Sequence, residues 1–257
     1  MCGIVGIYLK TKKFEKNLGK LLSGMLNNME SRGPDSAGFA IYKDEGRKVN
    51  KFSLCINGLN FNNFKKEISK KLKKAKFIHI SDHVILKTAE QPKKVLEILN
   101  SHFPDVSIVG YGKSIEIFKQ VGNPKDVVKK LKLEDFTGTH GIGHTRMATE
   151  SAITTDGSHP YSTGEDECLV HNGSLSIHNN LRRELTKKGN VFNSENDTEV
   201  AAWYVSHSLS NKKSLKDTLT SGLKDLDGFY TFITGTRKGF AVVRDEIACK
   251  PAVIAET

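Results

Sequence analysis

Short apolar segments with strand-like patterns lie at both ends of this chain, and they constrain its fold more than any other feature. Near the N-terminus, residues 2–9 (CGIVGIYL) and 36–42 (SAGFAIY) are apolar runs of strand length. Near the C-terminus, residues 229–234 (FYTFIT) and 240–243 (FAVV) flank a turn at 235–239 and predict a β-hairpin. The first and last apolar segments of the sequence are therefore expected to be strands.

Helical periodicity is clearest in three other segments. Residues 14–30 place six apolar side chains on one helical face, and residues 199–209 (EVAAWYVSHSL) are patterned in a similar way. Residues 179–189 (NNLRRELTKKG) predict a further helix that ends in a glycine cap. We expect these helices to cover sheets built from the terminal strands.

A lysine-rich segment, residues 58–135, has a pattern of its own. It predicts two helices and two strand pairs: a helix at 61–75, strands at 76–80 and 83–87, a helix from Pro92, and strands at 106–112 and 114–119. We interpret this segment as an α/β lobe inserted into the main fold.

The formal net charge of +10 is concentrated in this lobe. Residues 65–76 (KKEISKKLKKAK) hold seven lysines and one glutamate, on the outer face of an amphipathic helix. This face is either solvated or a surface for an acidic partner. No arginine or aromatic residue interleaves with the lysines, so we expect no nucleic-acid partner.

No apolar run reaches the length of a membrane span and no secretory signal is evident, so a cytoplasmic protein is expected.

The four cysteines (Cys2, Cys55, Cys168 and Cys249) are far apart and form no CxxC pair. Their spacing predicts neither a metal site nor an iron–sulfur cluster in this chain. Three of them lie in apolar contexts, where a buried thiol behaves as a small apolar side chain. Cys2 is the exception, because it directly follows the first methionine and precedes an apolar strand.

Polar stretches flanked by strands are the usual places for functional sites. Four occur here: residues 31–38 (SRGPDSAG), 143–162 (GHTRMATESAITTDGSHPYS), 169–176 (LVHNGSLS) and 193–200 (NSENDTEV). Behind an initial Met-Cys-Gly, and in this order, they resemble the class II glutamine amidotransferase domain of the N-terminal nucleophile hydrolases. The sequences of residues 32–40 (RGPDSAGFA) and 242–256 (VVRDEIACKPAVIAE) are most similar to those of amidotransferase subunits of the glutamate-synthase type.

The resemblance covers the chain except for the 58–135 lobe. It implies an α+β fold, a four-layer αββα sandwich in which two antiparallel sheets stack between helices. Residues 1–257 would form a single domain that carries the inserted lobe.

The resemblance also implies that Cys2 is a nucleophile which forms a γ-glutamyl thioester. Removal of Met1 would free the α-amine of Cys2, whose ordinary pKa of about 7.7–8.0 suits a base near neutral pH. Asn172 and Gly173 are the candidates for the oxyanion site. Taken alone, Cys2 could be a buried thiol of the first strand, and Asn172-Gly173 could be a hairpin turn.

Three residues would hold the amino-acid end of glutamine by the same resemblance. Arg146 would bind the α-carboxylate through its planar guanidinium, Thr149 would add a hydroxyl, and Asp197 would pair with the α-ammonium. The alternatives are a surface salt bridge for Arg146 and a helix N-cap for Asp197. His144 and His171, next to two of these motifs, are interpreted as structural.

Supporting roles are implied for Arg32 and Gly33, in a loop that faces the nucleophile and orders the N-terminal segment. Two positions depart from many relatives: Met147 replaces an aromatic residue and Glu150 replaces a histidine. These departures concern how the glutamine loop closes and how tightly it binds.

The implied reaction converts L-glutamine and water into L-glutamate and ammonia. The sequence shows no nucleotide-binding loop, and we expect no synthase domain in this chain. We therefore expect no cofactor in this chain and a partner synthase subunit, carrying FMN and an iron–sulfur cluster, that receives the ammonia. The alternatives are another acceptor, such as N-methylglutamate or an amino-sugar or purine precursor, and a non-catalytic glutamine-sensing subunit.

Overall fold

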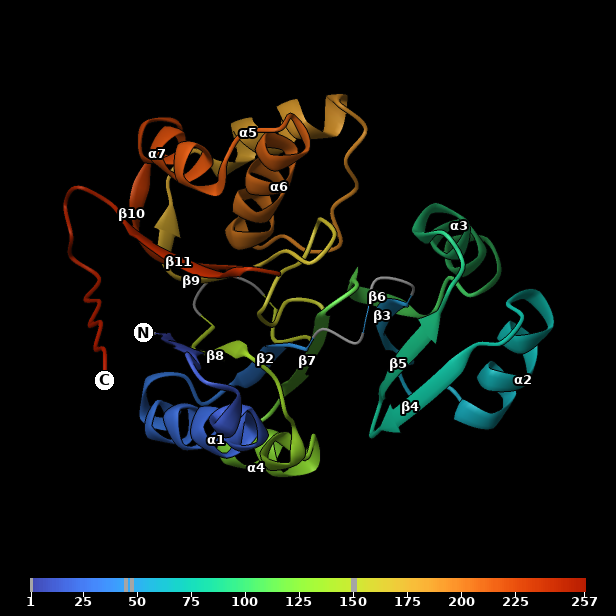
Figure 1. The fold of residues 1–257 in the computed structure, drawn as a ribbon. Helices are drawn as coiled ribbons and strands as arrows, with labels where there is room; N and C mark the ends of the chain where they lie inside the picture. Colours follow the sequence, from blue (N-terminus) through green and yellow to red (C-terminus); the bar gives the residue numbers. More distant parts are fainter. Residues whose placement is uncertain (1, 44–45, 47–48, 149–151) are drawn as a thin grey trace.

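Two stacked antiparallel sheets form the centre of the molecule (Figure 1). The computed structural model describes residues 2–43, 46, 49–148 and 152–257. The first sheet has the order β1 (Gly3–Tyr8), β8 (His140–Arg146), β2 (Ser36–Tyr42) and β7 (Ile115–Val121). The second has the order β11 (Gly239–Arg244), β10 (Gly228–Thr236) and β9 (Cys168–Leu175).

Apolar side chains from both sheets fill the space between them. Ala40, Ile117 and Ile142 of the first sheet pack with Val170 and Ile233 of the second. The alternation of side chains along each strand sends one set into this layer and the other set outward. Each sheet therefore still has an apolar outer face that must be covered.

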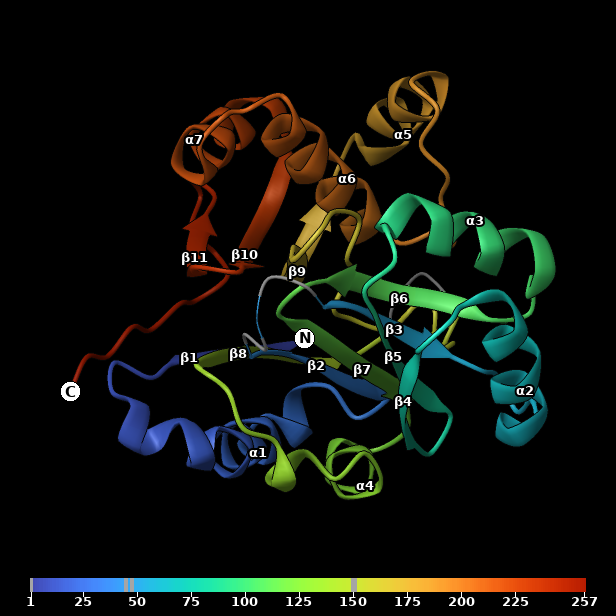
Figure 2. The same ribbon diagram turned by 45° about the vertical axis from the view of Figure 1, so that its right-hand side comes forward.

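Helices cover both outer faces (Figure 2). On the first sheet, α1 (Leu18–Asn28) and α4 (Pro124–Lys130) bury Leu22, Leu26 and Val128 against the strands. On the second sheet, α6 (Asp197–Ser210) and α7 (Leu215–Asp225) lie over β9 and β10, with α5 (His178–Lys187) beside α6. This succession of helices, two sheets and helices is the expected four-layer αββα sandwich.

A third sheet lies beside the sandwich. It has the order β4 (Lys76–Ile80), β5 (His83–Thr88), β3 (Asn50–Cys55) and β6 (Ser107–Gly112). Helices α2 (Phe61–Lys71) and α3 (Pro92–His102) cover it and close an apolar core of their own. We call residues 50–112 the third-sheet lobe.

The third-sheet lobe differs in extent from the 58–135 segment. Strand β3 precedes residue 58 but belongs to the third sheet, whereas β7 and α4 belong to the sandwich. Strands β6 and β7, expected to pair with each other, instead pair with β3 and β2. The reason is a long-range contact: the backbone N–H groups of Ser114 and Ile115 donate to the Asp166 carboxylate at 2.7 and 3.0 Å. A distant side chain thus satisfies the connection between the two strands.

A buried ion pair joins the third-sheet lobe to the sandwich. Lys51 of β3 is fully buried, and its Nζ lies 2.8 Å from Glu116 of β7. The same ammonium donates to the carbonyl of Lys43 at 2.9 Å.

In the part of the chain that the structure describes, no helix is long and apolar enough to cross a membrane.

Candidate active site

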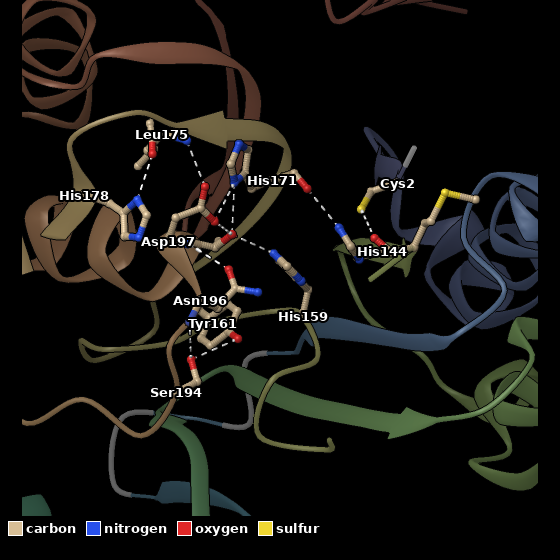
Figure 3. Close-up of polar contacts among 12 residues, drawn as sticks. Cys2, His144, His159, Tyr161, His171, Leu175, His178, Ser194, Asn196 and Asp197 are labelled. Atoms are coloured by element: carbon tan, nitrogen blue, oxygen red, sulfur yellow. Dashed lines mark hydrogen bonds and ion pairs between the residues drawn. The ribbon is translucent and has the colours of Figure 1, made fainter. Parts of the chain in front are cut away.

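Cys2 lies at the start of β1, where Gly3 pairs with Thr145 near the end of β8 (Figure 3). Its side chain is half-buried, and its Sγ lies 3.8 Å from the carbonyl oxygen of Met147. Arg32 donates from Nε to the carbonyl of Cys2 at 3.3 Å. The Arg32 side chain therefore contacts the residue that carries the thiol.

The loop at residues 32–35 fixes the chain that follows β8. A Cβ at Gly33 would overlap the carbonyl of Thr145, so the close approach of the two backbones requires glycine. Asp35 accepts a hydrogen bond from the backbone N–H of Ala148 at 2.7 Å. Gly33 and Asp35 thereby hold the residues on either side of Arg146 in place.

Arg146 ends β8 and is buried, which excludes an exposed salt bridge as its role. Its Nη1 donates to the carbonyl of Ala152 at 3.0 Å. Burial raises the pKa of the Cys2 thiol. A hydrogen bond with the backbone of Met147 and the positive charge of Arg146 lower that pKa, and the negative charge of Asp197 raises it. Both charged side chains therefore lie within electrostatic reach of the thiol.

Asn172 and Gly173 lie inside β9 and not in a hairpin turn. They pair with Thr231 and Tyr230 of β10. Gly173 has a φ of +150°, and a Cβ there would overlap the carbonyl of Phe229, so glycine is required. The turn that the Asn-Gly pair alone would predict is excluded.

Asp197 is the first residue of α6, and the preceding residue caps the helix. The side chain of Asn196 accepts from the backbone N–H of Thr198 at 2.9 Å, as an N-cap does. The N-cap alternative for Asp197 is therefore wrong. Its carboxylate is turned back to β9, where it accepts from the backbone N–H of Leu175 at 2.8 Å and lies 3.6 Å from Nδ1 of His171.

Asp197 is held as a carboxylate. Burial raises its pKa, but the opposing contacts with His171 and the Leu175 N–H are stronger together, and its pKa falls to about 2. A permanent negative charge at this position is what an α-ammonium group requires.

Three buried histidines surround the start of α6 (Figure 3). His144 contacts the carbonyl of His171 through Nε2 at 2.8 Å and stacks on His159 with ring centroids 3.8 Å apart. His159 and His171 share the hydroxyl of Thr198, at 2.9 and 3.0 Å. The sequence did not single out His159 or Thr198. Its one indication was that both lie in polar stretches, residues 143–162 and 193–200.

Burial decides the protonation of two of these rings. It lowers the pKa of His144 to about 3 and that of His159 well below its ordinary value. Both are therefore neutral and weakly basic near pH 7. His144 is poorly suited to take the thiol proton, in agreement with a structural role.

Two predicted positions fall outside the described residues, namely Thr149 and Glu150. Met147 is described and is 39% exposed, next to Cys2. Among the described residues, no group of histidine, cysteine, aspartate and glutamate side chains could hold a metal ion.

Comparison with known proteins places this geometry in context. Residues 144–257 match a glutamine amidotransferase domain family. The chain is 51% identical, over its full length and 86% of the relative, to a glutamine amidotransferase-like protein, GlxB, of Rhizobium meliloti. It is 31% identical, over its full length and 88% of the relative, to a putative glutamine amidotransferase of Methanothermobacter thermautotrophicus.

A solved structure supports the fold. An allosteric regulatory enzyme of purine biosynthesis superimposes on 95% of this chain and 37% of its own, with a TM-score of 0.59 and 18% identity. At that identity the likeness concerns the fold alone.

Proposed function

This chain belongs to the glutamine amidotransferase family, and we propose that it hydrolyses the side-chain amide of L-glutamine with Cys2 as the nucleophile. One observation carries this proposal: the fold brings Cys2, Arg146 and Asp197 to one end of the two sheets. Gly3 pairs with Thr145, so Cys2 and Arg146 are neighbours at the paired ends of β1 and β8. His144 of β8 contacts the carbonyl of His171 at 2.8 Å, and Asp197 lies 3.6 Å from the ring of His171. Cys2 directly precedes β1, Arg146 ends β8 and Asp197 begins α6, and these elements are distant in the sequence. Their convergence supplies one group for each functional part of an amino-acid amide.

Arg146 and Asp197 would select the amino-acid end of the substrate. A guanidinium binds a carboxylate through two parallel hydrogen bonds, and a carboxylate accepts from an ammonium group. An amide without the α-ammonium would leave the partly buried Asp197 carboxylate without a cationic partner on the substrate, which is less favourable. The pair therefore favours glutamine over simple amides.

Activation of the thiol requires a base, because burial raises the pKa of Cys2. We assign this role to the α-amine of Cys2 itself, which exists once Met1 has been removed. Met1 lies outside the described residues. His144, with a pKa of about 3, is a much weaker base than such an amine.

The proposed reaction has two stages. The α-amine takes the thiol proton, and the sulfur attacks the amide carbon of glutamine, whose oxygen becomes an oxyanion next to Asn172 and Gly173. The C–N bond breaks as the amine returns its proton to the nitrogen, which leaves as ammonia. Water then attacks the γ-glutamyl thioester on Cys2, so that glutamate leaves and the thiol is restored.

We further propose that the ammonia passes to a synthase of the glutamate-synthase type on a partner chain. The similarity of residues 32–40 and 242–256 to such amidotransferase subunits supports this assignment. FMN and an iron–sulfur cluster would belong to that partner. The basic face of α2, with Lys65, Lys66 and Lys71 exposed, offers a contact surface for an acidic region of the partner.

The test is covalent trapping with 6-diazo-5-oxo-L-norleucine, an electrophilic analogue of glutamine. We expect one label per chain on Cys2, located by peptide mapping, with loss of ammonia release from glutamine. Excess glutamine should slow the labelling, because both compounds bind at Arg146 and Asp197.

Cys249 provides the matched control, since it is a free and exposed thiol. The Cys249→Ala variant should label and hydrolyse glutamine like the wild type, whereas Cys2→Ala should do neither. Equal labelling of the two cysteines, or labelling that glutamine does not slow, would contradict the proposal.

A further inference from the structure

A buried lysine, Lys119, lies on β7 close to the loop that follows β8. Its exposed fraction is 5%, and its Nζ donates to the carbonyl oxygens of Asp156 at 3.0 Å and Ser158 at 2.9 Å. The same ammonium lies 4.7 Å from the centre of the Tyr161 ring. Within the described ranges, no carboxylate lies within ion-pair distance (4.0 Å) of it.

Burying an ammonium without a paired carboxylate is unfavourable for folding. Burial lowers the pKa of Lys119 to about 8, and the charges of Asp156 and Glu199 act against this decrease. The side chain is thus still cationic near pH 7. The buried cation is stabilised by two charge-assisted hydrogen bonds to backbone carbonyls and by its contact with the Tyr161 ring.

The two carbonyls belong to the residues on either side of Gly157, and Gly157 lies against Arg146. A Cβ at Gly157 would be 3.4 Å from Nη1 of Arg146. The same nitrogen donates to the carbonyl of Ala152, at the start of the described part of this loop. Residues 152–158 therefore connect the Lys119 ammonium with the Arg146 guanidinium.

Bonds within the loop make this connection compact. The backbone N–H of Gly157 donates to the hydroxyl of Thr154 at 2.9 Å, and the hydroxyl of Ser158 donates to the carbonyl of Thr154 at 2.8 Å. Gly157 and Ser158 cannot move far from Thr154 without breaking these bonds. A shift at Lys119 is thus transmitted to the surface on which Arg146 rests.

We propose that Lys119 is a positioning residue for glutamine binding. It fixes the backbone of residues 156–158 and, through Gly157, sets the direction of the Arg146 guanidinium. The inference rests on the proposed function, because it takes Arg146 as the group that binds the α-carboxylate. Lys119 itself touches neither the substrate nor the reacting atoms.

The test compares Lys119→Met and Lys119→Arg with the wild type in the full-length chain. Methionine fills similar space without charge or donors, so we expect KM for L-glutamine to rise about tenfold, with kcat within about twofold. Arginine restores a cationic donor and should recover part of the increase. Lys119→Gln, which keeps an amide donor, should give a smaller rise and serves if the methionine variant does not fold.

Lys51→Met is the matched control. Lys51 is also a fully buried lysine that donates to backbone carbonyls, but it lies at the junction with the third-sheet lobe. Its loss should lower the melting temperature and leave KM unchanged. A similar rise in KM in Lys51→Met would show that general loosening, and not positioning, raises KM, and would overturn the inference.

Glutamine binding measured without turnover separates the two proposals. In a Cys2→Ala background, the stabilisation of the chain by L-glutamine in thermal unfolding gives a Kd, which Lys119→Met should increase about tenfold. If the chain with Cys2 intact binds glutamine without hydrolysing it, and Lys119→Met still shows this increase in Kd, the proposed function is refuted and the inference is supported. An unchanged Kd and KM in a folded Lys119 variant overturns the inference alone, and no binding of glutamine overturns both.

Discussion

The third-sheet lobe and the site end of the sandwich bury different kinds of side chain. The lobe core is apolar, with residues such as Phe52, Phe64 and Leu86, and the lysines of α2 lie on the outside. Lys51, which is buried, lies at the junction with the sandwich and is paired with Glu116. The site end buries Arg146 and three histidines among polar partners. Because burial of polar groups is unfavourable unless each is partnered, their concentration at one end of the sandwich marks that end as the functional one. The apolar core of the lobe serves folding, and its exposed lysine face is the part proposed to contact a partner.

The sharpest way to test this contrast is the Cys2→Ala substitution. We expect glutamine hydrolysis to fall by a factor on the order of 10⁴ or more, because no other group supplies the nucleophile. Ammonia-dependent synthesis by the partner should persist. Ammonia release from glutamine measures the first effect, and wild-type release by this variant would refute the mechanism.

A substitution in the lobe core should lower stability and leave glutamine hydrolysis unchanged. Phe64 of α2 is 4% exposed and packs edge-on against Phe103, with ring centroids 5.3 Å apart. Phe64→Ala should lower the free energy of unfolding by about 3–5 kcal/mol because it leaves a cavity. Denaturant unfolding measures this loss. At temperatures where the variant is folded, kcat and KM for glutamine should match the wild type, and a fall in kcat would break the contrast.

Asn172→Ala addresses the oxyanion assignment. Loss of one donor to the developing negative charge should lower kcat about 10²–10³-fold, equivalent to about 3–4 kcal/mol. KM should change little, since the amide oxygen carries less charge before attack. Steady-state kinetics at saturating glutamine give the value. An equal loss in kcat for a Thr231→Ala control, the residue that pairs with Asn172 in the sheet, would point instead to distortion of β9.

The smallest effect concerns acid stability. The pKa of Asp197 falls from 3.8 to about 2 on folding, so its carboxylate stabilises the folded state above about pH 4. That contribution, about 2 kcal/mol, is lost as pH falls from about 4 to about 2. Asp197→Asn should remove this part of the pH dependence in unfolding experiments. A variant curve parallel to the wild type between these values would contradict the assignment.

Sequence periodicity was sufficient for elements whose own residues determine them. The hairpin of β10 and β11 and the pair β4 and β5 lie where the apolar pattern predicts. The amphipathic α2 begins at Phe61 as predicted but ends at Lys71 and not at 75, with Leu72 as its C-cap. The stacking of two sheets between helices followed from resemblance, since no local pattern states which sheets face each other.

Features that depend on distant residues could not be read in this way. Strands β6 and β7 join different sheets because Asp166, far along the chain, holds their connection. Asn196, and not Asp197, caps α6, since either residue type is a good cap and only the tertiary contact with Leu175 decides. His159 and Thr198 contact each other only because the fold brings β8, the loop after it and α6 together, and neighbouring residues in the sequence do not predict this contact.

The most direct test of the central claim is mass spectrometry of the chain after rapid acid quench during glutamine turnover. A nucleophilic Cys2 with its own amine as the base predicts an N-terminal peptide that begins at Cys2 and carries a γ-glutamyl group on its sulfur. A chain that turns over glutamine while it retains Met1, or that carries the γ-glutamyl group on another residue, would contradict the account.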